Sequence, residues 1–99
     1  MQEGIDLENL PVVREIDAER DRLGRAGDVI ISDLKARGEL PKEQHDAMTE
    51  VLGAVVEYSD SLNFARAGIL ASTVHPDDPQ LDRLIARSNA VSTSILAAA

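Results

Sequence analysis

Arg66 is the side chain in this sequence best suited to hold an anion. It is the only charged residue between Ser61 and Pro76, and helical spacing places it beside the apolar side of its segment. Asn63 precedes it by three residues, while Ser88 and Ser92 fall on the apolar side of a later segment. If these polar groups converge with Asn89, they form a pocket for a small anionic ligand or the site of a small helical enzyme. The alternative is that the Arg66 stem only covers apolar surface and that the serines only let helices approach closely.

A second cluster, Arg20, Arg22 and Arg25, resembles a phosphate-binding patch in composition. Acidic residues interleave with these arginines, so the local charge nearly cancels, and Asp21 and Arg25 are spaced to pair along a helix. We therefore expect a solvated face carrying salt bridges. The acidic members of this face are Glu15, Asp17, Glu19, Asp21 and Asp28.

The sequence gives little support for a metal site or a reactive thiol. The chain has no cysteine, and its two histidines, His45 and His75, are far apart and lack the Glu-x-x-His spacing of bundle metal sites. His75 is followed by Asp77 and Asp78, which helix capping and turn formation explain better than cation binding. The sequence predicts no cofactor and no catalytic residue.

The start of the first predicted helix is similar to that of the all-helical chorismate mutase family, with Arg14, Ile16 and Asp17 as the matching residues. The similarity ends there, because the later arginine, lysine and acidic site residues of that family have no counterparts in suitable positions. We therefore assign no family on this resemblance.

Three long segments with helical periodicity must position all of these residues. Proline and glycine punctuate the chain near residues 11, 38–41 and 76–79, and the spacing predicts helices over 10–37, 41–73 and 79–97. Asn9 or Asp6 could cap the first helix, and Asp78 before Pro79 is the strongest start signal. Residues 1–9 are predicted to form an arm, and residues 10–99 one bundle domain.

These helices are long for a chain of 99 residues. At 1.5 Å per residue they would extend roughly 42, 50 and 28 Å, and short connections make consecutive helices antiparallel. The prediction is an all-α fold: an elongated antiparallel bundle of three long helices. Only 30 larger apolar side chains are available, a small number for one core, which favours an oligomer.

The second predicted helix has two apolar sides. One side carries Val55 and its helical neighbours. Nearly opposite lie small residues and one aromatic side chain: Val56, Phe64, Ala67 and Ala71. This second side either packs against both other helices of the same chain or forms an interface with another copy or partner. We expect the interface.

The composition restricts the classes of function. The net charge of −8 argues against direct nucleic-acid binding, which needs clustered Lys and Arg. No apolar run is long enough to span a membrane and the acidic start is no signal peptide, so a cytoplasmic location is expected. We expect a non-catalytic acidic helical interaction module that self-associates and binds a protein partner. Its concrete form would be an inhibitor or adaptor of phage or bacterial regulatory origin.

Overall fold

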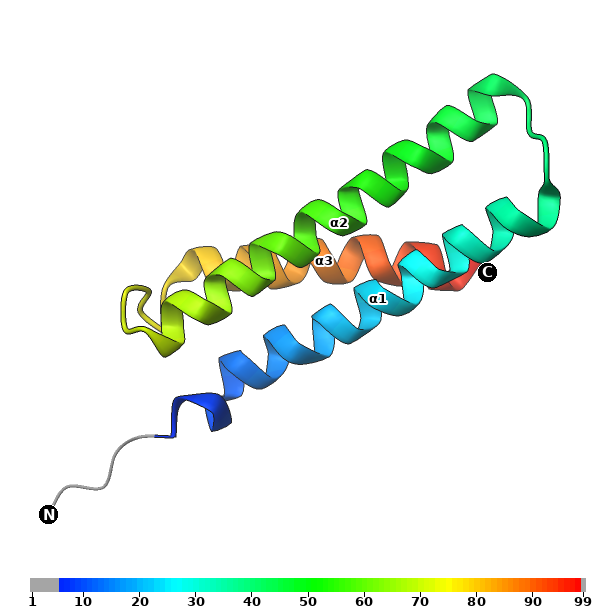
Figure 1. Cartoon of the computed structure of the whole chain (residues 1–99). Helices are drawn as coiled ribbons and strands as arrows, with labels where there is room; N and C mark the ends of the chain where they lie inside the picture. Colours follow the sequence, from blue (N-terminus) through cyan, green and yellow to red (C-terminus); the bar gives the residue numbers. More distant parts are fainter. Residues whose placement is uncertain (1–5, 99) are drawn as a thin grey trace, which may run out of the picture.

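Three helices form an elongated antiparallel bundle, as the sequence predicts (Figure 1). The computed structural model describes residues 6–98. A short 3-10 turn, η1 (Leu7–Asn9), precedes α1 (Pro11–Arg37), α2 (Lys42–Leu70) and α3 (Pro79–Ala98), and residues 6–98 contain no strand. Of the predicted arm, residues 1–5 lie outside the described residues.

The bundle is built around α1. This helix packs along both α2 and α3, whereas α2 and α3 contact each other less extensively. The radius of gyration is 16.3 Å, compared with about 13 Å for a compact domain of this length, which agrees with the predicted elongation. None of the helices within residues 6–98 is long and apolar enough to cross a bilayer.

The core follows the predicted apolar stripes. Helical spacing of three and four brings these side chains to one side of α1 and of α2, where each helix meets its neighbours. Phe64 and the other members of the second apolar side of α2 contribute nothing to this core. The buried apolar residues are Val13, Ile16, Leu23, Ala26, Ile30, Val55, Leu62, Ala65, Ile69 and Leu81.

The helix starts agree with the prediction within one residue, but the cap expected for α1 is wrong. Its N-cap residue is Leu10, and neither Asp6 nor Asn9 caps the first turn with its side chain. Asn9 instead donates to Asp6 and accepts a hydrogen bond from Arg14 Nη2 at 3.1 Å. The expected cap of α3 is confirmed, because Asp78 Oδ1 accepts a hydrogen bond from the Gln80 N–H at 2.9 Å.

The second helix ends three residues earlier than predicted, at Leu70. Ser72 adopts a positive φ of 62°, which turns the chain out of the helix. The carbonyl of Gly68 then accepts hydrogen bonds from the N–H groups of Thr73 and Val74 at 2.8 and 3.1 Å. This turn folds Val74 back onto Gly68, where a side chain would collide with it.

Candidate interaction surfaces

The second apolar side of α2 faces away from the bundle. We call this surface the outer face. Phe64 is 80% exposed and Val56 is 52% exposed, whereas Val55 is buried. The structure therefore contradicts the alternative in which Phe64 packs against the other helices of its own chain. The outer face consists of Thr49, Gly53, Val56, Glu57, Asp60, Phe64, Ala67 and Ala71, all of them exposed.

Gly53 of the outer face does not pack against the described part of the chain. A Cβ built on Gly53 would meet no heavy atom of residues 6–98 within 4 Å, so none of these neighbours requires the absence of a side chain. Glycine inside a helix costs up to about 1 kcal/mol relative to alanine. Gly27 differs, because a Cβ there would contact Val55 and Leu52 of α2. Gly53 leaves space on the outer side of α2, next to exposed Val56.

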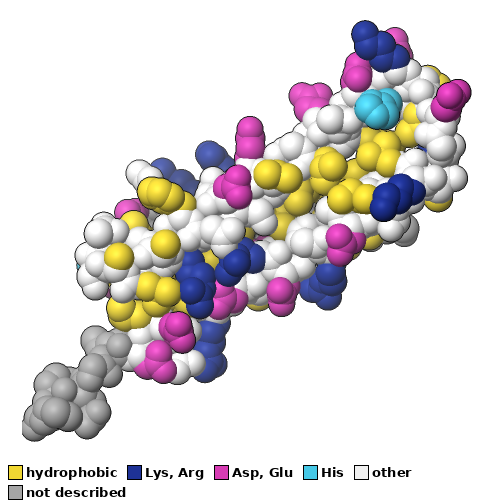
Figure 2. Space-filling model, viewed as in Figure 1, with side chains coloured by type: hydrophobic (Ala, Val, Ile, Leu, Met, Phe, Trp, Pro, Cys, Tyr) yellow, Lys and Arg dark blue, Asp and Glu magenta, His cyan; other side chains and the backbone are white. Residues whose placement is uncertain are grey.

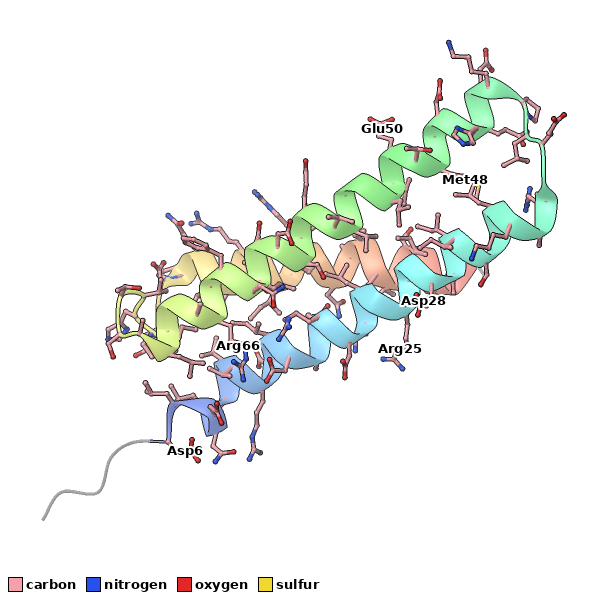
Figure 3. All side chains as sticks on the ribbon, viewed as in Figure 1. Asp6, Arg25, Asp28, Met48, Glu50 and Arg66 are labelled. Atoms are coloured by element: carbon pink, nitrogen blue, oxygen red, sulfur yellow. The ribbon has the colours of Figure 1, made fainter. Side chains whose placement is uncertain are left out.

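Arg66 lies between α1 and α2 and is paired. Its Nε donates to Asp17 Oδ1 at 2.8 Å, and Arg20 Nη1 reaches the same oxygen at 3.3 Å. Figure 3 shows Arg66 directed from α2 toward α1. Asn63 shares with Arg66 a polar pocket of about 360 Å³ that also includes Asp21 and is open to solvent. The carboxylates of Asp17 and Asp21 offset the charge of the two arginines, so the pocket has no excess positive charge for an anion.

The two serines predicted to join Arg66 lie elsewhere. Ser88 and Ser92 are fully buried on α3, and they do not line the pocket that holds Asn63 and Arg66. The Ser88 hydroxyl donates to the Leu84 carbonyl at 2.8 Å, and the Ser92 hydroxyl donates to the Asn89 carbonyl at 3.2 Å. Both serines therefore satisfy their polar groups within α3 while presenting small side chains to the rest of the bundle.

Glu19 is not solvent-exposed, contrary to the prediction of a solvated face. Its exposure is only 5%. Its Oε1 accepts hydrogen bonds from Arg22 and, at 2.8 Å, from Asn89 Nδ2 of α3, while its buried Oε2 has no hydrogen-bond partner among the described residues. The signal was present: Glu19 follows Ile16 by three residues and precedes Leu23 by four, so it belongs to their stripe.

The other ion pairs of α1 also differ from the expected pattern. Within residues 6–98, the salt bridges on this helix join Arg20 to Asp17, Arg22 to Glu19 and Arg37 to Asp33, and Asp21 does not pair with Arg25. Figure 3 shows Arg25 and Asp28 on the side of α1 away from α2. The net result is still a helix surface on which positive and negative charges alternate.

His75 has the turn role expected from the sequence. Its Nδ1 accepts a hydrogen bond from the Asp77 N–H at 3.1 Å, immediately before the cap of α3. The part of the chain that the structure describes contains no group of three or more histidine and carboxylate side chains arranged for a metal ion.

A wide groove lies at the end of the bundle where α1 connects to α2. It has a volume of about 740 Å³ and is formed by the last turns of α1, the first turns of α2 and the end of α3. Most of its lining side chains are apolar, with a polar rim on α1. We call it the open-end groove; its lining residues are Asp28, Val29, Ile30, Ser32, Asp33, Ala36, Arg37, Met48, Ile95 and Ala98.

No protein-family model, curated protein or solved structure matches this chain.

Proposed function

We propose that this protein is a non-catalytic interaction module that self-associates through the outer face of α2 and binds a protein partner elsewhere on its surface. The observation that carries the proposal is the 80% exposure of Phe64 in the middle of a face made of small residues. Two separate binding surfaces favour an adaptor. One surface would join copies of the chain, and the other would remain free to bind a partner protein.

Phe64 is the residue of the outer face whose burial would contribute most free energy. Burying a phenylalanine side chain that is otherwise in water contributes roughly 1.5–3 kcal/mol. In a symmetric dimer each copy contributes its own Phe64, so the gain is counted twice. Val56 adds apolar area, and Gly53, Ala67 and Ala71 leave room for a second helix to approach closely. Aromatic anchors surrounded by small residues are typical of the centre of an interface.

Charge opposes the contact of two copies at this face. Each chain carries a net charge of −8, so two copies repel at most parts of their surfaces. Asp60 lies within the outer face and exposed Glu57 lies seven residues before Phe64 on the same side of α2, so the burial of Phe64 and Val56 must outweigh the repulsion of these carboxylates. An apolar face on a monomer would instead stay in contact with water without compensation.

The test compares the parent with Phe64→Glu and with a matched variant, Ala90→Glu, which adds the same charge at an exposed position of α3. Sedimentation equilibrium over a wide concentration range gives the mass, and circular dichroism gives the helix content. We expect the parent and Ala90→Glu to associate, and Phe64→Glu to be monomeric with its helices retained. A parent that is monomeric at every concentration, or a Phe64→Glu variant that still associates, contradicts self-association through this face.

A further inference from the structure

The pocket that holds Arg66 lies between the first half of α1 and the second half of α2. Figure 2 shows basic and acidic side chains next to one another in this part of the bundle, whereas hydrophobic side chains lie between α1 and α2 near their connection. The pocket has a volume of about 360 Å³, and each of the two helices contributes three of its side chains. We call it the polar pocket; its lining residues are Asp17, Arg20, Asp21, Ser59, Asn63 and Arg66.

The lining of the polar pocket restricts the chemistry of a ligand. Its volume lies within the range of pockets that bind small molecules. All six lining side chains carry a charge or a hydrogen-bonding group, so a ligand gains little from apolar contact and must itself be polar. Two arginines and two aspartates give the pocket no net charge. A ligand that matches this lining is therefore small, polar and neutral overall.

The two arginines of the polar pocket share one carboxylate oxygen. Arg66 Nε and Arg20 Nη1 both donate to Asp17 Oδ1, at 2.8 and 3.3 Å. The Nη1 and Nη2 groups of Arg66 form no hydrogen bond within residues 6–98, although the Arg66 side chain is only 27% exposed. A guanidinium group presents its N–H donors in a planar fork that matches a carboxylate. These two arginines can therefore bind a second carboxylate in addition to that of Asp17.

The second aspartate of the polar pocket has the opposite requirement. In the part of the chain that the structure describes, Asp21 forms no salt bridge, although Arg20 is its neighbour in the sequence and Arg25 follows it by four residues. The side chains of Ser59 and Asn63 form no hydrogen bonds with residues 6–98 either. The polar pocket thus has guanidinium donors for one more carboxylate, and a free carboxylate for one cation.

We propose that the polar pocket binds a small zwitterion of the amino-acid class, which carries one carboxylate and one ammonium group. The carboxylate accepts hydrogen bonds from the guanidinium groups of Arg20 and Arg66, and the ammonium group donates to Asp21. A simple anion or a simple cation satisfies only one of these two groups and brings a net charge into a pocket that has none. The polar pocket contains no residue of the outer face, so this site goes beyond the proposed self-association.

The probes are glycine, β-alanine and γ-aminobutyrate, in which carbon chains of increasing length separate the two charged groups. Acetate and methylammonium are the control ligands, because each carries only one of the two charges. Binding is followed by the NMR signals of the Arg20 and Arg66 Nε–H groups, which Arg20→Lys and Arg66→Lys identify. All titrations use one protein concentration, so that any self-association of the chain stays constant.

We expect at least one zwitterion to shift the Arg66 signal saturably and to bind about tenfold more tightly than acetate or methylammonium. Arg66→Lys keeps the charge but removes the planar fork, and should weaken the zwitterion about tenfold at the Arg20 signal. Asp21→Asn should weaken the zwitterion by a similar factor and strengthen acetate, because the pocket gains a net positive charge. Asp28→Asn makes the same substitution at an exposed position of α1 outside the pocket, and should change either affinity by less than about twofold.

Three results would overturn the proposal. The first is the absence of a saturable shift with every zwitterion of the series. The second is acetate that binds the parent as tightly as the best zwitterion, which would indicate an anion site. The third is equal weakening by Asp21→Asn and Asp28→Asn, which would show that Asp21 does not hold the ammonium group. Asp21 is exposed and forms no salt bridge within residues 6–98, so its substitution leaves the fold intact and keeps this test valid. A parent that proves monomeric contradicts self-association and leaves these shifts unaffected.

Discussion

The placement of single residues in this protein is decided mainly by which helix faces which neighbour. Glu15 and Glu19 are four residues apart on α1, yet Glu19 is buried where α1 meets α3 and Glu15 is exposed. The difference is one of position on the helix, because Glu19 lies on the stripe of Ile16 and Leu23 and Glu15 does not. Within residues 6–98, one Glu19 oxygen has no hydrogen-bond partner.

We predict that Glu19→Leu stabilises the protein. Removing a buried carboxylate that is only partly satisfied, and filling its place with an apolar side chain, typically gains about 1–4 kcal/mol or is neutral. Arg22 and Asn89, which lose their acceptor, are accessible enough to be hydrated. Urea unfolding in the monomeric Phe64→Glu background measures the change without a contribution from association.

The matched control for that experiment is Glu15→Leu. It makes the same substitution four residues earlier on α1, at an exposed position, and should change the free energy of unfolding by less than about 0.5 kcal/mol. If Glu19→Leu destabilises the protein instead, the hydrogen bonds to Asn89 and Arg22 outweigh the cost of burying the carboxylate.

At the level of elements, the ends of the helices show how local signals and packing combine. Pro79 and Asp78 define the start of α3 by local chemistry, which is why the sequence predicts it well. The end of α2 depends on a contact between residues that come together only after the turn forms. Val74 folds back onto Gly68, and periodicity alone extends the predicted helix to residue 73 because it contains no information on this contact.

Substitutions at two helix glycines should therefore have opposite effects. In Gly68→Ala the new Cβ would lie 2.5 Å from Val74 Cγ2, so the turn after α2 must shift, and we expect a loss of about 1–3 kcal/mol. In Gly24→Ala the Cβ meets no atom within 4 Å, and the better helix propensity of alanine should gain up to about 1 kcal/mol. Thermal unfolding of both variants in the Phe64→Glu background checks the signs, and a stabilised Gly68→Ala would contradict the packing described for this turn.

At the level of the whole molecule, charge and apolar surface act against each other. The net charge of −8 opposes contact between copies, while burial of the exposed Phe64 and Val56 is the term that would favour the self-association proposed for the outer face. An equilibrium set by these two terms depends on ionic strength, because salt screens repulsion between surface charges and leaves the burial of apolar area intact.

We predict that self-association of the parent strengthens as salt rises from about 0.05 to 0.5 M. The screening length falls from more than 10 Å to less than 8 Å over this range, which weakens the repulsion between copies. Asp60→Asn, which removes one of the negative charges of the outer face, should associate more tightly than the parent at low salt. Sedimentation equilibrium at several salt concentrations measures both effects, with Phe64→Glu as the variant expected to stay monomeric throughout. Association that weakens with salt would indicate that attractive ion pairs hold the copies together.

The amino-acid sequence by itself determined the number of helices, their starts, their antiparallel order and the elongated shape. These properties follow from signals contained within each segment: apolar residues spaced by three and four, a capping aspartate, and prolines and glycines at the boundaries. Helical geometry alone likewise placed Val55 and Phe64 on opposite sides of α2.

The tertiary structure decided which of the two apolar sides of α2 is covered, which carboxylate of α1 is buried, and which partner Arg66 has. Each of these depends on residues that are distant in the sequence: Asp17 and Arg66 are 49 positions apart, and Glu19 and Asn89 are 70 apart. The open-end groove also depends on the tertiary structure, because residues of all three helices line it. Periodicity describes one helix at a time, whereas burial is a property of how three helices of unequal length pack together.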